Sequence, residues 1–177
     1  MFIMGKERDY IIHNDHEIKG FFGEYRFLSN FEVAGVYFEG VLYPSTEHAY
    51  QAAKSLDPEI RKQFLNITCA EAKNLGNGKK LKNHPDLMSI ILREDWESVK
   101  FDIMFSVCFD KFYRHSNLRQ KLLDTGKRYL EETNHWGDRI YGVCDGEGKN
   151  MLGQILMKIR EIIRFTSNYS GISLNFM

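Results

Sequence analysis

The order of the hydrophobic patterns along the chain is the feature that most constrains its fold. Residues 18–22 and 33–43 are rich in aromatic and β-branched side chains, and Gly35 and Gly40 stand where turns are needed. These patterns predict a small β-hairpin or sheet near the N-terminus. The segments after Pro44 carry helical patterns instead. Strands followed by helices indicate an α+β fold, a predominantly helical single domain.

Three helices are expected directly after the strands. Ser45 or Thr46 supplies the N-cap of a helix that we expect to run to about Leu56. Two short helices, over residues 59–65 and 69–75, follow it.

Two longer helices are expected in the second half of the chain. Residues 96–114 are hydrophobic on nearly every face, a pattern typical of a helix that is buried all round. Asn150 is the expected N-cap of a last helix, whose apolar stripe covers residues 151–163. Its capping role is the favoured interpretation of the preceding Gly146–Gly148 turn, although such a turn could also offer free backbone N–H groups to a phosphate.

Length and charge place the chain in a broad class. It has 177 residues with 24 basic and 24 acidic side chains. This length suits one domain, which we place at residues 18–165, between an N-terminal segment (1–17) and a polar C-terminal tail (166–177). A net charge of zero excludes a protein that holds nucleic acid mainly by bulk positive charge, and leaves room for a local basic patch.

The three cysteines, Cys69, Cys108 and Cys144, form no CxxC pair, which suits a reducing compartment. The polar start of the sequence is unlike a signal peptide, and no apolar run is long enough to span a bilayer. We therefore expect a cytoplasmic protein without membrane contact.

Several familiar motifs are weak or missing. Residues 75–80 contain glycines and lysines without the P-loop spacing. His13 and His16 could share a metal, but solvated surface histidines are the favoured interpretation, so no metal site is predicted. The signatures of serine hydrolases and zinc deaminases are missing from the sequence.

The segment from Tyr43 to Lys54 is the most informative one. On a helix, Glu47, Tyr50, Gln51 and Lys54 would share one face. Glu47 and Lys54 would then stand two turns apart, roughly 10 Å along the axis, with room for a polar ligand between them. Glu47 falls in the first turn, where the helix dipole favours a carboxylate. A solvated helix face explains the same pattern and stays open.

A second polar and aromatic cluster covers residues 130–142. Trp136 and Tyr141 could stack on a base or flank a sugar, and Glu132 and Asp138 could bind ribose hydroxyl groups. The alternative is a structured loop whose aromatic rings fill the core.

Arg26 and Asn30 lie between the first strand and the hairpin. Both are candidate ligand contacts. For Asn30, an ordinary turn asparagine is the alternative.

Six segments in this order resemble the YbiA/NADAR family, over about residues 20–164. They are FLSNF (27–31), YPSTEHAYQAAK (43–54), DW (95–96), LLDTG (122–126), LEETNHWGDRIYG (130–142) and GKNMLGQILMKIR (148–160). The resemblance implies a YbiA-like fold. It also implies an N-glycosidase that acts on ribosylated nucleobases without a cofactor.

The resemblance also implies roles for individual residues. Glu47 would be a catalytic carboxylate, and Lys54 an amine that can trap the ribose C1 as a Schiff base. By the resemblance, Trp96, Glu132, Asp138 and Tyr141 would line the substrate pocket, with Asn150 and Gly153 on its phosphate side. The residue patterns described above add further predicted substrate contacts, namely Arg26, Asn30, Tyr50, Gln51 and Trp136. The family usually carries tryptophan where this chain has Tyr141.

Two family branches suggest different substrates. We favour removal of ADP-ribose from ADP-ribosylated guanine in DNA. The alternatives are phosphoribosyl intermediates of riboflavin synthesis, or a non-catalytic ADP-ribose or nucleotide reader. The expected partner is a ribosyl-base substrate, either small or linked to nucleic acid. Lys79, Lys80 and Lys82 could make a transient DNA contact, although a solvated surface is the favoured role of these lysines.

Overall fold

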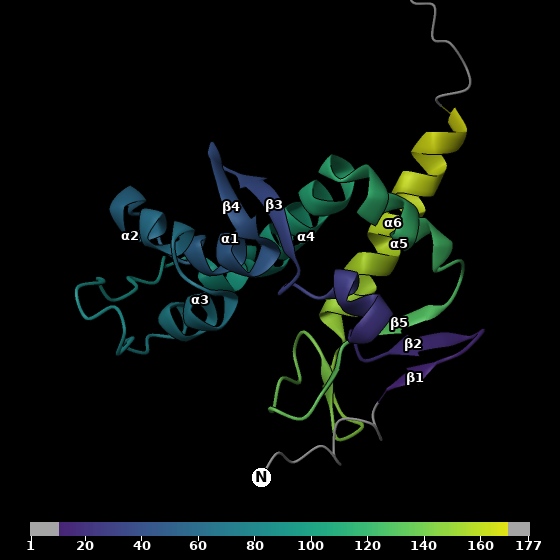
Figure 1. Cartoon of the computed structure of the whole chain (residues 1–177), viewed down its shortest axis with the longest axis horizontal. Coiled ribbons are helices and arrows are strands. Elements are labelled where there is room, and N and C mark those ends of the chain that lie inside the picture. Colours follow the sequence, from purple (N-terminus) through teal and green to yellow (C-terminus); the bar gives the residue numbers. More distant parts are fainter. Residues whose placement is uncertain (1–10, 170–177) are drawn as a thin grey trace, which may run out of the picture. The chain divides into compact units, whose positions relative to one another are not determined.

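The computed structural model describes residues 11–169, with side chains up to Thr166. Within this range the chain forms two compact units, drawn with all helices and strands in Figure 1. One unit is Asn30–His115, and the other combines residues 11–29 with residues 116–169.

The Asn30–His115 unit begins with the predicted β-hairpin. Strands β3 (Val33–Phe38) and β4 (Val41–Ser45) pair antiparallel. Glu39 and Gly40 join them with φ angles of 44° and 86°. Two consecutive residues with positive φ are typical of a type I′ turn, whose backbone twist matches the twist of the two strands it joins. The hairpin prediction is confirmed.

Helix α1 (Thr46–Ala52) begins where the sequence indicates but ends earlier. The Ser45 side chain accepts a hydrogen bond from the His48 N–H, so Ser45 is the N-cap. The predicted end near Leu56 is wrong. After Ala52 the chain tightens into a turn, in which the Lys54 N–H donates to the Gln51 carbonyl. The approaching Pro58, which disfavours helix in the residue before it, limits any extension.

The two short helices that follow are confirmed. Helix α2 (Pro58–Lys62) continues into the 3-10 turn η2 (Gln63–Leu65). Helix α3 (Cys69–Gly76) starts with a capping box formed by Thr68 and Glu71. Helices α1 and α3 pack against each other, which brings the end of α3 close to α1.

Helix α4 (Trp96–Arg114) has the predicted span but is not buried all round. Its buried face includes Trp96, Met104 and Phe112, and it packs against β3 and α1. A second row of rings, Phe105, Phe109 and Tyr113, stacks along the helix with Tyr113 65% exposed. The sequence pattern overestimated burial because aromatic residues can also cover one another on a surface.

The second unit is built on a three-stranded sheet of order β1-β2-β5. Strands β1 and β2 pair antiparallel, whereas β2 and β5 pair parallel. Helix α6 packs on β5, and α5 packs on α6. The elements are β1 (Ile12–His13), β2 (Glu17–Lys19), the 3-10 helix η1 (Gly23–Leu28), α5 (Ser116–Asp124), β5 (Tyr129–Glu131), β6 (Thr133–Asn134), β7 (Val143–Cys144) and α6 (Met151–Tyr169).

The second unit also refines the expected element bounds. The strand expected over 18–22 covers only Glu17–Lys19, and α6 continues past the expected domain end at 165 to Tyr169. Part of the expected tail, from 170 onward, lies outside the described residues. The domain boundaries themselves stay a prediction.

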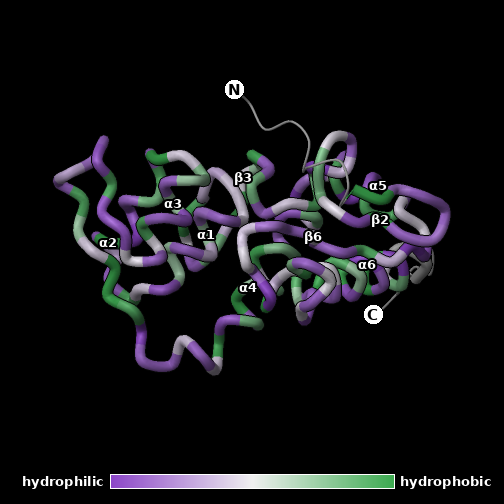
Figure 2. Tube along the Cα trace, turned by 90° about the horizontal axis from the view of Figure 1, so that it is seen from below, coloured by the Kyte–Doolittle hydropathy of each residue, from purple (hydrophilic) through white to green (hydrophobic). Residues whose placement is uncertain are grey.

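Helices predominate beside small sheets, so the α+β fold class is confirmed. Hydrophilic positions recur along α4 and α6 (Figure 2). Between residues 11 and 169, no helix has the length and apolarity needed to cross a membrane.

Candidate active site

Asn30 anchors the start of α1. Its backbone carbonyl accepts a hydrogen bond from the Glu47 N–H at 3.0 Å. Its buried side chain donates to the Met104 Sδ at 3.4 Å and accepts from the Cys108 thiol at 3.7 Å. Asn30 therefore fixes the first turn of α1 to the core of its unit. Its predicted contact with substrate stays a prediction.

Glu47 is a buried carboxylate with a defined partner. Glu47 is only 6% exposed, and its Oε1 accepts a hydrogen bond from the Gln51 Nε2 at 2.8 Å. The two residues are one helical turn apart, as the sequence spacing indicates. A buried charged acceptor with a fixed amide donor is held in one orientation.

Gly76, at the end of α3, makes room for Gln51. A Cβ atom at position 76 would lie 2.0 Å from the Gln51 Oε1, so only glycine fits there. The Gln51 Oε1 is itself buried without a hydrogen-bond partner among the described atoms. Gly76 therefore determines where the amide that holds Glu47 can lie.

Lys54 lies just beyond α1, in the turn that ends the helix. The expectation that it shares a helix face with Glu47 is wrong, because α1 ends at Ala52. The Lys54 Nζ donates to the Gly76 carbonyl at 2.8 Å and to the Asn77 Oδ1 at 3.0 Å. Gly76 therefore contacts both the lysine and the glutamine that orients Glu47.

Burial controls the charge of Lys54. Desolvation lowers the pKa of its amine to about 8, the Glu47 carboxylate acts in the opposite direction, and Lys73 lowers the pKa further. The charge of Glu47 thus raises the pKa of Lys54, although Lys54 lies beyond the end of the helix that carries Glu47. An amine with this pKa is partly neutral near physiological pH.

Two aromatic rings stand beside the amine. The rings of Tyr50 and Trp96 lie 5.1 Å apart between centroids, and the Lys54 Nζ lies 5.8 Å from the Trp96 ring. The Arg93 N–H donates to the Lys54 carbonyl at 2.8 Å, which ties the segment before α4 to this turn. The Asn30–His115 unit thus brings together six predicted residues, namely Asn30, Glu47, Tyr50, Gln51, Lys54 and Trp96.

The other predicted residues belong to the second unit. Most lie in or beside the loop between β6 and β7, and Arg26 is exposed in η1. This group consists of Arg26, Glu132, Trp136, Asp138, Tyr141, Asn150 and Gly153.

Asp138 and Asn134 hold the β6–β7 loop in shape. The Asp138 Oδ1 accepts hydrogen bonds from the Ile140 and Tyr141 N–H groups at 3.0 and 2.9 Å. The Asn134 amide donates to the Asp138 carbonyl at 2.7 Å, and its Oδ1 accepts from the N–H groups of Trp136 and Asp138. Sequence reasoning missed Asn134, although asparagine side chains in turns commonly bond the backbone two residues further on, as Asn134 does at Trp136.

The aromatic residues of this loop differ in exposure. Trp136 is 47% exposed, and its ring meets the His135 ring edge-on at 5.3 Å between centroids. Tyr141 is half-buried. The alternative that all the aromatic residues of this loop fill the core is therefore wrong for Trp136. Its contact with a base stays a prediction.

Asn150 is not a side-chain cap of α6, contrary to the favoured expectation. Its Oδ1 accepts from the Glu132 N–H at 3.1 Å, and its Nδ2 donates to the Leu130 carbonyl at 2.8 Å and to the Tyr129 hydroxyl at 2.9 Å. The Asn150 side chain instead hydrogen-bonds backbone groups at the end of strand β5. The backbone of Asn150 itself has a positive φ of 49°.

Four backbone N–H groups at the start of α6 are already hydrogen-bonded. The N–H groups of residues 149–152 donate to the carbonyls of residues 139–142. At Gly153, a Cβ would lie 2.1 Å from the Leu130 carbonyl, so glycine is needed where α6 crosses β5. The predicted role of Asn150 and Gly153 on the phosphate side is not tested by these contacts.

The histidine pair near the N-terminus shows no metal-site geometry. The His13 Nε2 bonds to the Gly20 carbonyl at 3.1 Å, and its ring packs edge-on against Tyr25. His16 is exposed. No group of three His, Cys, Asp or Glu side chains within residues 11–169 is arranged to hold a metal ion.

The fold and site define a class of small α+β proteins with a buried carboxylate and a low-pKa amine close together. The family model of the NADAR domain matches residues 12–164. This chain belongs to the NADAR family.

Named relatives agree with this assignment. The chain is 34% identical to N-glycosidase YbiA of Escherichia coli over 78% of this chain and 81% of that protein. It is 33% identical to N-glycosidase Npun_R5314 of Nostoc punctiforme over 84% and 92% of the two chains. The riboflavin biosynthesis protein VVA0006 of Vibrio vulnificus is 31% identical over 81% of this chain, but the match spans only 37% of that longer protein.

A solved structure confirms the fold. The NMR structure of E. coli YbiA matches with a TM-score of 0.73 and 31% identity. The match covers 91% of this chain and 92% of the other. The predicted family resemblance and YbiA-like fold are both confirmed.

Proposed function

We propose that this chain removes ADP-ribose from ADP-ribosylated guanine in DNA, with Glu47 and Lys54 as its catalytic residues. The coarser class, a hydrolase acting on N-glycosyl bonds, follows from family membership and from N-glycosidase relatives at 33–34% identity. The observation that carries the residue assignment is the half-buried Lys54 amine, which donates to the Gly76 carbonyl and has a pKa of about 8, under the influence of the buried Glu47 carboxylate.

Glu47 suits the first stage of the reaction. As the bond between C1 of the ribose and the base nitrogen breaks, positive charge builds at C1, and the base leaves with the bonding electron pair and takes up a proton. A carboxylate held by Gln51 in a buried site stabilises that charge without reorganising.

Lys54 suits the role of the nucleophile. Its neutral amine forms a bond to C1 as the bond from C1 to the base breaks, and one proton of the amine passes to the departing base. The C1–O bond of the ribose ring then opens, the remaining N–H proton moves to the ring oxygen, and an imine results. Water then hydrolyses the imine, which returns the amine and releases the sugar. Burial frees the amine for this step by lowering its pKa.

Each unit carries residues that are candidate substrate contacts. The Tyr50–Trp96 ring pair beside Lys54 offers an apolar wall for a base. In the second unit, the exposed Trp136 and the ordered Asp138 loop offer further contacts. The choice of a guanine substrate rests on the likeness of the segments around Asn30–Tyr50 and 134–142 to that branch of the family.

Two alternatives make different predictions. The relatives VVA0006 and maize PYRR are named riboflavin biosynthesis proteins, which favours phosphoribosyl intermediates as a second candidate. A non-catalytic reader would bind ADP-ribose and release it intact. We also propose a cytoplasmic location, since all three cysteines are free thiols.

The test is incubation of the purified protein with ADP-ribosylated guanine in DNA and, separately, with the riboflavin phosphoribosyl intermediates. Mass spectrometry then measures the released base and sugar. We expect cleavage of the guanine substrate, lost in Glu47→Gln and Lys54→Ala. Cleavage of the riboflavin intermediates alone would select the second candidate, and binding without cleavage would select the reader.

A further inference from the structure

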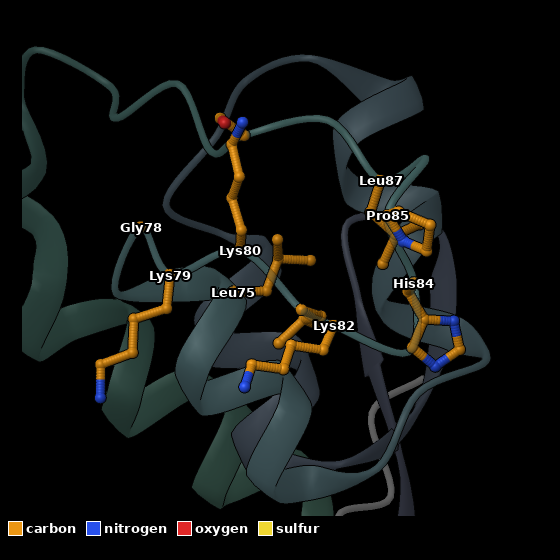
Figure 3. A pocket seen from close by; sticks show the side chains of 10 residues that line it. Leu75, Gly78, Lys79, Lys80, Lys82, His84, Pro85 and Leu87 are labelled. Atoms are coloured by element: carbon orange, nitrogen blue, oxygen red, sulfur yellow. The ribbon is translucent and has the colours of Figure 1, made fainter.

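The segment after α3 forms a basic hollow in the Asn30–His115 unit (Figure 3). Its volume is about 320 Å³, and a neighbouring hollow of about 260 Å³ shares its lysines. Lys79, Lys80 and Lys82, here called the connector lysines, line both hollows. We infer that the connector lysines bind the phosphodiester backbone of the nucleic-acid strand that carries the modified base, an inference that rests on the proposed function.

The connector lysines form an exposed group of three cations close together in the sequence. They are exposed, and none takes part in the ion pairs formed within residues 11–169. Five other cations of the unit are in ion pairs, namely Arg61–Glu39, Lys62–Glu59, Arg93–Asp95, Lys100–Glu97 and Arg114–Asp110. A positive cluster is thus concentrated at one place in a chain of zero net charge.

The acidic side chain at the neighbouring hollow is already engaged. Glu71 accepts hydrogen bonds from the Thr68 N–H and hydroxyl, both at 2.8 Å, and lies 3.5 Å from the His84 Nε2. These contacts hold the pKa of Glu71 below its usual range. The Glu71 carboxylate therefore bonds the start of α3 and forms no ion pair with a connector lysine among the ion pairs within residues 11–169.

The connector lies next to the proposed catalytic amine. Gly76 and Asn77 accept the two hydrogen bonds of the Lys54 Nζ, and the first connector lysine follows two residues later. The Lys79 N–H donates to the Asn74 carbonyl at 2.9 Å, which fixes the connector to the end of α3. Two residues span at most about 7 Å, so phosphates next to a nucleotide bound at Lys54 fall within reach of the lysines.

The arrangement of the ammonium groups favours a strand over a single phosphate. Figure 3 shows Lys79 and Lys82 extending to one side of the connector and Lys80 to the other. A site for one phosphate needs converging donors, whereas separated cations match successive phosphates. No Phe, Tyr or Trp side chain is among the residues that line the hollow, and its charged groups are lysines, which favours contact with the backbone rather than with the bases.

The direct test is fluorescence anisotropy with a labelled, unmodified 12-nucleotide oligodeoxythymidylate. We expect K79Q/K80Q/K82Q to bind roughly 100-fold more weakly than wild type at 0.1 M salt, because three lost phosphate contacts change the slope of log K against log salt by about 2. A matched variant that loses the same charge elsewhere, K62Q/K127Q/K158Q, should stay within about threefold of wild type.

Cleavage assays separate this inference from the proposed function. The connector variant should cleave the free nucleoside, ADP-ribosylated guanosine, at the wild-type rate. It should cleave the same modified base within a DNA strand more slowly than wild type does. If wild type cleaves neither, the proposed function fails, and the anisotropy still decides the inference. The inference would be overturned if the connector variant bound the oligonucleotide as tightly as wild type does. It would also be overturned if inorganic pyrophosphate displaced the labelled oligonucleotide from wild type as effectively as unlabelled oligonucleotide does.

Discussion

The pH dependence of catalysis should report the ionisation of Lys54. Only the neutral amine attacks C1, and burial lowers the pKa of this amine from 10.5 to about 8. At pH 7 roughly a tenth of the molecules then carry a neutral amine, against about 0.03% for an exposed lysine, a gain of roughly 300-fold. The single-turnover rate should therefore rise about tenfold per pH unit below 7.5 and level off above about 8.5.

The charge of Lys73 provides a second test of the pH profile. The positive charge of Lys73 lowers the pKa of Lys54. Lys73→Met should therefore move the pH profile to higher pH and lower the rate at pH 7 without changing the plateau. The matched control Lys62→Met removes an exposed lysine that pairs with Glu59, and its profile should coincide with that of wild type.

The assay is rapid-quench single turnover with ADP-ribosylated guanosine between pH 5.5 and 10. Single turnover isolates the chemical step from product release. A flat profile across this range, or a shift of the Lys73→Met profile to lower pH, would refute the assignment of Lys54 as an amine that acts in its neutral form.

Three further predictions concern the surroundings of the site. Gly76→Ala should lower the single-turnover rate at least tenfold, because its Cβ would lie 2.0 Å from the Gln51 Oε1 and displace the amide that holds Glu47. The stability of wild type relative to Lys54→Met, from urea unfolding, should rise between pH 8 and 10.5 by up to about 3 kcal/mol, because the folded state binds the Lys54 proton less tightly than the unfolded chain does. Asn134→Ala should cost about 1–3 kcal/mol in urea unfolding, because it leaves buried loop groups unpaired.

Each of these predictions can fail clearly. Gly76→Ala with a wild-type rate would show that the Gln51 position does not matter for Glu47. A stability difference that falls between pH 8 and 10.5 would mean that the Lys54 pKa is not lowered. An Asn134→Ala protein as stable as wild type would mean that the loop does not depend on its side-chain bonds.

Local sequence signals predicted the elements that local interactions determine. The β3–β4 hairpin, the Ser45 cap and the start of α3 each depend on residues within a few positions of one another. Glu47 and Gln51 share a helix face as predicted, and because one helical turn separates them their side chains form a hydrogen bond. These features were accessible without knowledge of the tertiary structure.

Features set by tertiary contacts were missed. The role of Gly76 depends on its approach to Gln51, 25 positions earlier, and no local pattern signals that contact. Lys54 was identified as a candidate but placed on a helix that ends before it, so its partners Gly76 and Asn77 were not foreseen. Asn150 looked like a helix cap because the competing strand β5 is distant in sequence.

The most direct test of the account is borohydride trapping on Lys54. Wild type and Lys54→Arg would be incubated with ADP-ribosylated guanine in DNA, reduced with borohydride, digested and analysed by mass spectrometry. The account predicts a ribose-derived adduct on the peptide that contains Lys54, and neither adduct nor turnover in Lys54→Arg. Wild-type turnover by Lys54→Arg without any adduct would contradict it.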